Sequence, residues 1–243
     1  MKSKLSLFLF ALSAYMIAGL TSCDSDGYSL GDMYVSLAAV ETYDNGEARS
    51  FTLDGGKTLF VAATTTNYIP KNERVLINYT ILGDNYEGYD HAIRLNYYME
   101  DVLTKPIVYI PADDQKKQDS IGYDKIKVET LFARRGYITI EFGYNMGGKD
   151  AHMLNLVALE EDKKQEGDEP IKLQFRHNIG NDEELFGSGL MYVCFRLDDY
   201  IEANEDRSEL SFEVSWEEYN GETKSVTLKY PLTKDGEENS EIE

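Results

Sequence analysis

Residues 210–216 read LSFEVSW, so every second side chain in this stretch is apolar and those between are Ser or Glu. Successive side chains of a β-strand point to opposite faces, and this alternation therefore predicts a strand with one buried face. The same period of two recurs in residues 138–144 (ITIEFGY) and 171–176 (IKLQFR). No segment has a sustained helical period, so the sequence predicts an all-β protein.

The strands fall into two groups. Residues 124–232 hold about seven of them, a number typical of an antiparallel immunoglobulin-like β-sandwich, with Trp216 as the expected core aromatic. The Cys…Trp…Cys spacing of true immunoglobulin domains is absent, so this likeness concerns architecture only. Residues 30–105 hold about five shorter strands, which predict a small N-terminal OB-like barrel ahead of the sandwich.

A segment of different composition separates the two groups. Residues 106–123 contain Pro106, Pro111 and a cluster of charged side chains around one short apolar piece, and we predict a linker here. The last residues, 233–243, are acidic and have no apolar pattern, which predicts a disordered tail.

The N-terminus has the layout of a secretory signal. Lys2 and Lys4 precede an apolar run at residues 5–20, which is shorter than the ~20 residues that a membrane-spanning helix needs. The run ends in Leu-Thr-Ser-Cys at residues 20–23, which resembles a bacterial lipobox. We therefore predict a lipoprotein signal peptide at residues 1–22, lipidation of Cys23, and an acidic tether over residues 23–29.

Charge and cysteine content exclude several classes of protein. The formal net charge is −20, which disfavours nucleic acid and bare anionic membrane surfaces as partners, so lipid is expected to hold the chain at the membrane. The chain has two cysteines. If Cys23 carries lipid, Cys194 has no partner for a disulfide, and its apolar neighbours predict a small buried core residue.

Side chains that could support chemistry are few. His91, His152 and His177 share the parity of apolar neighbours at strand ends, which predicts hydrogen-bonded histidines at the rim of a core. No zinc-binding spacing is present, and neither 181–184 nor 198–199 has the spaced ligands of a Ca²⁺ loop, so both are predicted to be solvated turns. A hydrolase is the weakest hypothesis, because 44 acidic residues make any carboxylate pair uninformative. We expect no enzyme activity, no metal and no cofactor.

Several segments together resemble one known family. The lipobox, DVLTKP at 101–106, GYITIEF at 136–142, HMLNLV at 152–157 and LQFRHN at 173–178 are similar to the NigD-like lipoproteins of Bacteroidetes. The resemblance implies an OB-like domain followed by a β-sandwich, a Gram-negative envelope, and an immunity role beside a bacteriocin. It carries over no catalytic or binding residue.

Two short motifs gain meaning from that resemblance. Asp24-Ser25-Asp26 is similar to acidic signals that export lipoproteins of this phylum to the cell surface. Asp119-Ser120-Ile121 matches a short O-glycosylation motif used there, which makes Ser120 a candidate O-glycosylation site. The resemblance thus implies an outer-membrane lipoprotein, and its orientation toward the periplasm or the cell surface stays open.

The sequence supports two functional hypotheses. The first is a non-catalytic, lipid-anchored envelope protein that binds a protein partner, of an immunity-like type, and does not bind nucleic acid. The alternative is a cell-surface glycan-binding module, because tyrosines near loops and strand ends can stack on sugars or anchor protein contacts. The tyrosines in question are Tyr86, Tyr89, Tyr97, Tyr98, Tyr123 and Tyr144.

Overall fold

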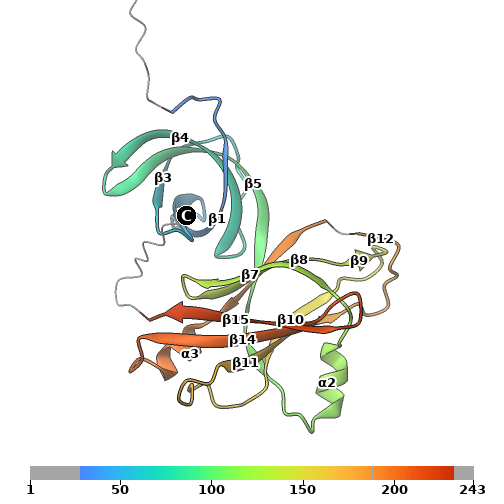
Figure 1. Ribbon diagram of the computed structural model, residues 1–243. Coiled ribbons are helices and arrows are strands. Elements are labelled where there is room, and N and C mark those ends of the chain that lie inside the picture. The colour runs from blue at the N-terminus through green and yellow to red at the C-terminus, as the bar shows by residue number, and fades with distance from the viewer. Residues whose placement is uncertain (1–27, 188, 233–243) are drawn as a thin grey trace, which may run out of the picture.

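The computed structural model describes residues 28–187 and 189–232, and within these ranges the chain is built mainly of strands (Figure 1). The predicted signal peptide, Cys23, the Asp24-Ser25-Asp26 motif and the acidic tail lie outside the described residues. The all-β prediction, with an OB-like barrel followed by a β-sandwich, is confirmed.

Five strands form the N-terminal barrel. They run in the order β3-β2-β1-β4-β5, and β3 pairs with β5 in parallel, which closes the sheet on itself. Inward-facing apolar side chains such as Phe51, Ile77 and Ile93 are fully buried at its centre. The bounds are β1 Tyr34–Thr42, β2 Ala48–Leu53, β3 Thr58–Thr64, β4 Arg74–Tyr86 and β5 Tyr89–Pro106.

Two packed sheets form the C-terminal sandwich. One continues from β5 through β13, β8 and β7, and the other has the order β15-β14-β11-β10-β6. Trp216 belongs to the core between them, as expected. Most pairings are antiparallel, whereas β13–β5, β11–β14 and β10–β6 are parallel. The bounds are β6 Val108–Tyr109, β7 Lys127–Arg134, β8 Tyr137–Gly143, β10 Met153–Ala158, β11 Ile171–Asn178, β13 Met191–Arg196, β14 Glu209–Glu217 and β15 Thr223–Pro231.

Strand β5 belongs to both domains. Its first part pairs with β3 and β4 in the barrel, and Leu103–Pro106 pairs with β13 in the sandwich. The segment predicted as a linker, 106–123, contains β6 and helix α2 (Gln115–Ile121). The Asp114 side chain caps α2 by accepting from the Lys117 N–H, and the helix buries Gln118. A second short helix, α3 (Asp198–Ala203), follows β13.

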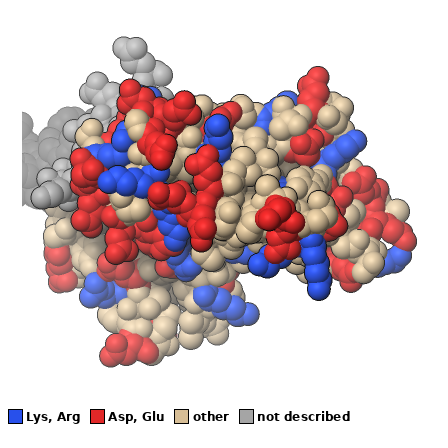
Figure 2. Space-filling model, turned by 90° about the horizontal axis from the view of Figure 1, so that it is seen from below, with Lys and Arg blue, Asp and Glu red and all other residues tan. Residues whose placement is uncertain are grey.

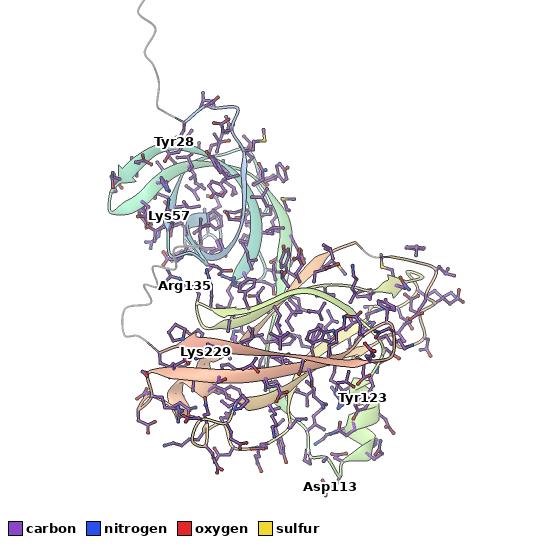
Figure 3. All side chains as sticks on the ribbon, in the orientation of Figure 1. Tyr28, Lys57, Asp113, Tyr123, Arg135 and Lys229 are labelled. Carbon is purple, nitrogen blue, oxygen red and sulfur yellow. The ribbon has the colours of Figure 1, made fainter. Side chains whose placement is uncertain are left out.

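Charged side chains fill the junction between barrel and sandwich. The Arg74 guanidinium is fully buried, lies 2.6 Å from Asp54 Oδ1, and stacks 5.0 Å from the centre of the Tyr137 ring. Cys194 is buried, as predicted, but it lies outside the sandwich core cluster and contacts Thr139. Arg135 marks this junction in Figure 3. The shared strand and the buried ion pair together fix one domain against the other.

Candidate functional site

A small ribbon at one end of the sandwich organises the most distinctive cluster of polar groups. Strands β9 (Asn145–Met146) and β12 (Phe186–Gly187) pair with each other only, and we call residues 145–152 and 179–187 the clasp. Figure 1 places the clasp at the far end of β8, at the end of the sandwich opposite α3. Besides the Lys149–Glu183 ion pair and the hydrogen bond from the Asn181 N–H to Asp150, its two loops are held together by one buried carboxylate.

That carboxylate is Asp182. It accepts hydrogen bonds from the backbone N–H groups of Gly147 at 2.9 Å, Gly148 at 3.1 Å and Lys149 at 2.9 Å. Its side chain is completely buried, so the prediction of a solvated turn at residues 181–184 is wrong for this residue. The turn is instead closed by contacts with a loop more than 30 positions earlier in the chain.

Two histidines connect Asp182 to the sandwich. His152 Nε2 lies 3.0 Å from Asp182 Oδ2, and His152 Nδ1 lies 2.8 Å from His177 Nε2. His177 Nδ1 donates in turn to the carbonyl oxygen of Lys125 at 3.0 Å. The Tyr144 ring stacks on His152 with 4.2 Å between ring centres. The chain of hydrogen bonds therefore runs from the clasp through β11 to the segment before β7.

The surroundings shift the titration of two of these groups. Burial opposes ionisation of Asp182, but the backbone N–H groups and His152 outweigh it and hold the pKa of the carboxyl far below its usual range. Burial lowers the pKa of His177, which favours its neutral form. The imidazoles are enclosed and bonded to each other, so the arrangement is suited to holding structure rather than to attacking a substrate.

Large apolar side chains lie exposed next to this network. The exposed fractions are 66% for Leu185 and 53% for both Phe186 and Leu190. On the outer face of the barrel, Val35 and Tyr97 flank the same β4 residue, Asn78, and Met99 follows two positions along β5; all three are about half exposed.

One hydrogen bond joins strand β5 of the barrel to the start of β13 in the sandwich. Glu100, which follows Met99, accepts a hydrogen bond from the Tyr192 N–H at 3.1 Å, and Tyr192 lies two residues after Leu190. Glu100, next to Met99 on β5, therefore lies beside the start of β13. We call these six residues the interdomain surface: Val35, Tyr97, Met99, Leu185, Phe186 and Leu190.

A second region combines aromatic and basic groups beside α2. The Arg176 guanidinium lies 3.4 Å from the centre of the Tyr123 ring, and both residues donate to Gln118 Oε1. They border a small hollow of about 40 Å³ that Trp216 also lines. Figure 3 shows Tyr123 next to α2, on the far side of the sandwich from the barrel. Trp216 is almost completely buried and offers little open face to a ligand.

The other residues singled out in the sequence are scattered. Of the six tyrosines, Tyr86, Tyr97 and Tyr123 are exposed, whereas Tyr98 packs against the barrel core. His91 lies in the barrel, with Nδ1 2.6 Å from Asp84 Oδ1. Ser120 lies exposed on α2, and its hydroxyl donates to the Lys117 carbonyl.

Membrane-spanning and metal-binding features were sought within residues 28–187 and 189–232. No helix in these ranges is long and apolar enough to cross a membrane. The same ranges hold no group of three His, Cys, Asp or Glu side chains placed to bind a metal ion.

Comparisons with known proteins give a consistent pattern. Residues 37–100 match the family of NigD-like N-terminal OB domains, and residues 109–230 match the family of NigD-like C-terminal beta sandwich domains. No curated protein matches the chain.

Several solved structures resemble the whole fold. A protein of unknown function, DUF1344, from Bacteroides vulgatus is 26% identical, with a TM-score of 0.68 over 84% of this chain and 94% of that one. A protein from Parabacteroides distasonis, provisionally described as toxin-related, is 29% identical, with a TM-score of 0.68 over 84% and 96% of the two chains. A NigD-like immunity protein from Bacteroides caccae is 18% identical, with a TM-score of 0.62 over 84% and 99%.

Proposed function

We propose, from the premise that this chain belongs to the NigD-like family, that it is a non-catalytic, lipid-anchored envelope protein of the immunity type that binds a protein partner. A solved structure described as a NigD-like immunity protein shares the fold, which supports a role of the immunity type. The partner is then a protein toxin or another envelope protein.

The interdomain surface is the observation that carries this proposal. Exposed apolar side chains that gather in one place are the usual mark of a protein contact, and large aromatic and aliphatic anchors contribute most of the binding energy. Phe186 and Tyr97 are the aromatic members of the surface, and Met99 is a flexible one that adapts to a partner's shape. The enclosed histidines, His152 in the clasp and His177 on β11, support a binding role over a catalytic one.

The proposed lipid on Cys23 would leave the interdomain surface accessible to a partner. Four residues separate Cys23 from Tyr28, the first described residue, so the tether spans at most ~18 Å when extended. Tyr28 lies on the barrel, on the side away from the sandwich (Figure 3). Figure 2 shows Asp and Glu gathered on the underside of the sandwich, which would face away from the membrane. Mass spectrometry of the mature N-terminal peptide tests the lipid on Cys23 directly.

Partner capture with matched variants tests the proposal. The mature chain carrying Cys23→Ser is mixed with detergent-solubilised envelope of its own organism, and bound proteins are identified by mass. We expect one stoichiometric partner, which Phe186→Ser combined with Met99→Ser removes. Val226→Ser is the control, because Val226 is also apolar and exposed but lies on β15. Equal capture by all three proteins, or no capture by well-folded bait, would contradict the proposal.

Glycan binding is the second candidate. The half-exposed Tyr123 ring beside the hollow favours it, because aromatic faces stack on sugars. Trp216 lines the same hollow and serves as a fluorescent reporter. A polysaccharide that changes the emission in the wild type but not in Tyr123→Ala would support this function, and a flat response across a broad panel would remove it.

A further inference from the structure

We propose that the clasp is a proton-binding site, in which His152 and His177 share one proton beyond those of their neutral forms and this proton holds the clasp against the sandwich. Such a site would regulate the interdomain surface. This consequence rests on the proposed function, whereas the proton count does not. The physical basis of the site is a count of hydrogens along the chain of hydrogen bonds.

Each of the three contacts, from Lys125 to His177, from His177 to His152 and from His152 to Asp182, needs one hydrogen atom. The Lys125 carbonyl can only accept, so His177 Nδ1 carries a hydrogen. An ionised Asp182 can only accept, so His152 Nε2 carries a second one. The contact of 2.8 Å between the remaining two ring nitrogens requires a third. Two neutral imidazoles carry only two hydrogens, and the pair must therefore hold one extra proton and one positive charge.

The surroundings keep the extra proton on the imidazoles and leave Asp182 ionised. Three backbone N–H groups donate to the carboxylate, and each favours its ionised form. The face of the Tyr144 ring lies against His152, and an aromatic face attracts a cation. Because burial lowers the pKa of His177, the extra proton is expected on His152, directly beside its counter-ion.

Other charged groups face the same pair. Asp124 and Glu184 act on His177 from the segment before β7 and from the clasp, and both favour its protonated form. Lys149 at the edge of the clasp is paired with Glu183, so its positive charge is largely compensated. The local balance is acidic, which helps the pair to retain one proton.

Both gain and loss of a proton break the hydrogen bond between His152 Nδ1 and His177 Nε2. When the shared proton leaves at higher pH, two nitrogen lone pairs face each other across 2.8 Å. When a second proton is added at lower pH, two N–H groups face each other instead. The closed clasp, with Phe186 in a fixed position, is therefore confined to a pH window that belongs to the coupled pair and not to one histidine.

Ring-nitrogen NMR tests the proton count without any partner. The chain has three histidines, so the long-range ¹H–¹⁵N spectrum of the mature chain with Cys23→Ser is simple to assign. We expect a doubly protonated His152 and a neutral His177 with its hydrogen on Nδ1, and the signals of both rings to change in the same step as the pH is raised. A neutral His152 in the closed clasp would overturn the proposal.

Amide exchange tests the mechanical consequence. We expect the protection of Gly147 and Gly148, corrected for intrinsic exchange, to fall at least tenfold in the wild type as pH rises through that step. His152→Gln should remove the pH dependence, and His91→Gln should not, because His91 pairs with Asp84 in the barrel. If His152→Gln does not fold, His177→Asn replaces it. Protection that is independent of pH in the wild type would refute the inference, whereas failure of partner capture alone would refute only the proposed function.

Discussion

Replacing Arg74 by Met should destabilise the whole protein, because it leaves the Asp54 carboxylate at the domain junction without its ion-pair partner. The Arg74 side chain has no exposed surface, and the Asp54 side chain is only 14% exposed. Removing one member of a buried pair typically costs about 3–5 kcal/mol, since the remaining charge stays desolvated. For a chain of this size about 1 kcal/mol corresponds to roughly 2–4 °C, so the melting temperature should fall by about 6–20 °C.

The double variant Asp54→Leu with Arg74→Met provides the internal check. Arg74 meets Asp54 only through Nη2, and Arg74 Nε and Nη1 have no hydrogen-bond partner among the described residues, so the pair is incompletely satisfied. Apolar replacement of both members should therefore restore the stability to within about 1 kcal/mol of the wild type. Thermal unfolding of the three proteins, followed by circular dichroism, measures this. A double variant that is as unstable as Arg74→Met alone would refute the reasoning.

Three further outcomes are expected. Gly122→Ala should lower the melting temperature by several degrees in a thermal scan, because Gly122 has a φ of 77° and an added Cβ would lie 2.7 Å from the His177 carbonyl oxygen. Cys194 should react with a thiol reagent only when urea unfolds the protein, because it is buried and burial raises the pKa of its thiol. Asp182 has a pKa below its ordinary value of 3.8, so the stability that it contributes is complete above that pH and is lost as the pH falls below it. In urea titrations at several pH values, the free energy of unfolding of Asp182→Asn should therefore depend less on acid pH than that of the wild type.

The strands could be predicted because their signal is local. The alternation in residues 210–216 and 138–144 requires only that successive side chains point to opposite faces, and both stretches are strands in the structure. The placement of Trp216 in the sandwich core follows from the same parity. The helices α2 and α3 span seven and six residues, which is too short to produce a recognisable helical period in the sequence.

The candidate site could not be predicted, because its contacts join segments that are distant in the chain. Asp182 bonds to backbone N–H groups 33 to 35 positions earlier, and His152 meets His177 across 25 positions. A backbone N–H has no side-chain signature, so nothing in the residues around Asp182 distinguishes a buried clasp from a solvated turn. His152 and His177 could be expected at the rim of a core, but their mutual contact could not.

The continuity of β5 connects these findings to binding. The interdomain surface is divided between the barrel and the sandwich, and a surface of that kind presents one shape only if the two domains do not move relative to each other. A partner that had to fix two mobile domains would lose part of its binding energy in ordering them. Strand β5 pairs in the sheets of both domains, and Arg74 is buried at the junction between the domains. The two domains are therefore already fixed relative to each other in the free protein. Arg74→Met should therefore weaken partner capture even at temperatures where the variant stays folded, although Arg74 has no exposed atom with which to touch a partner.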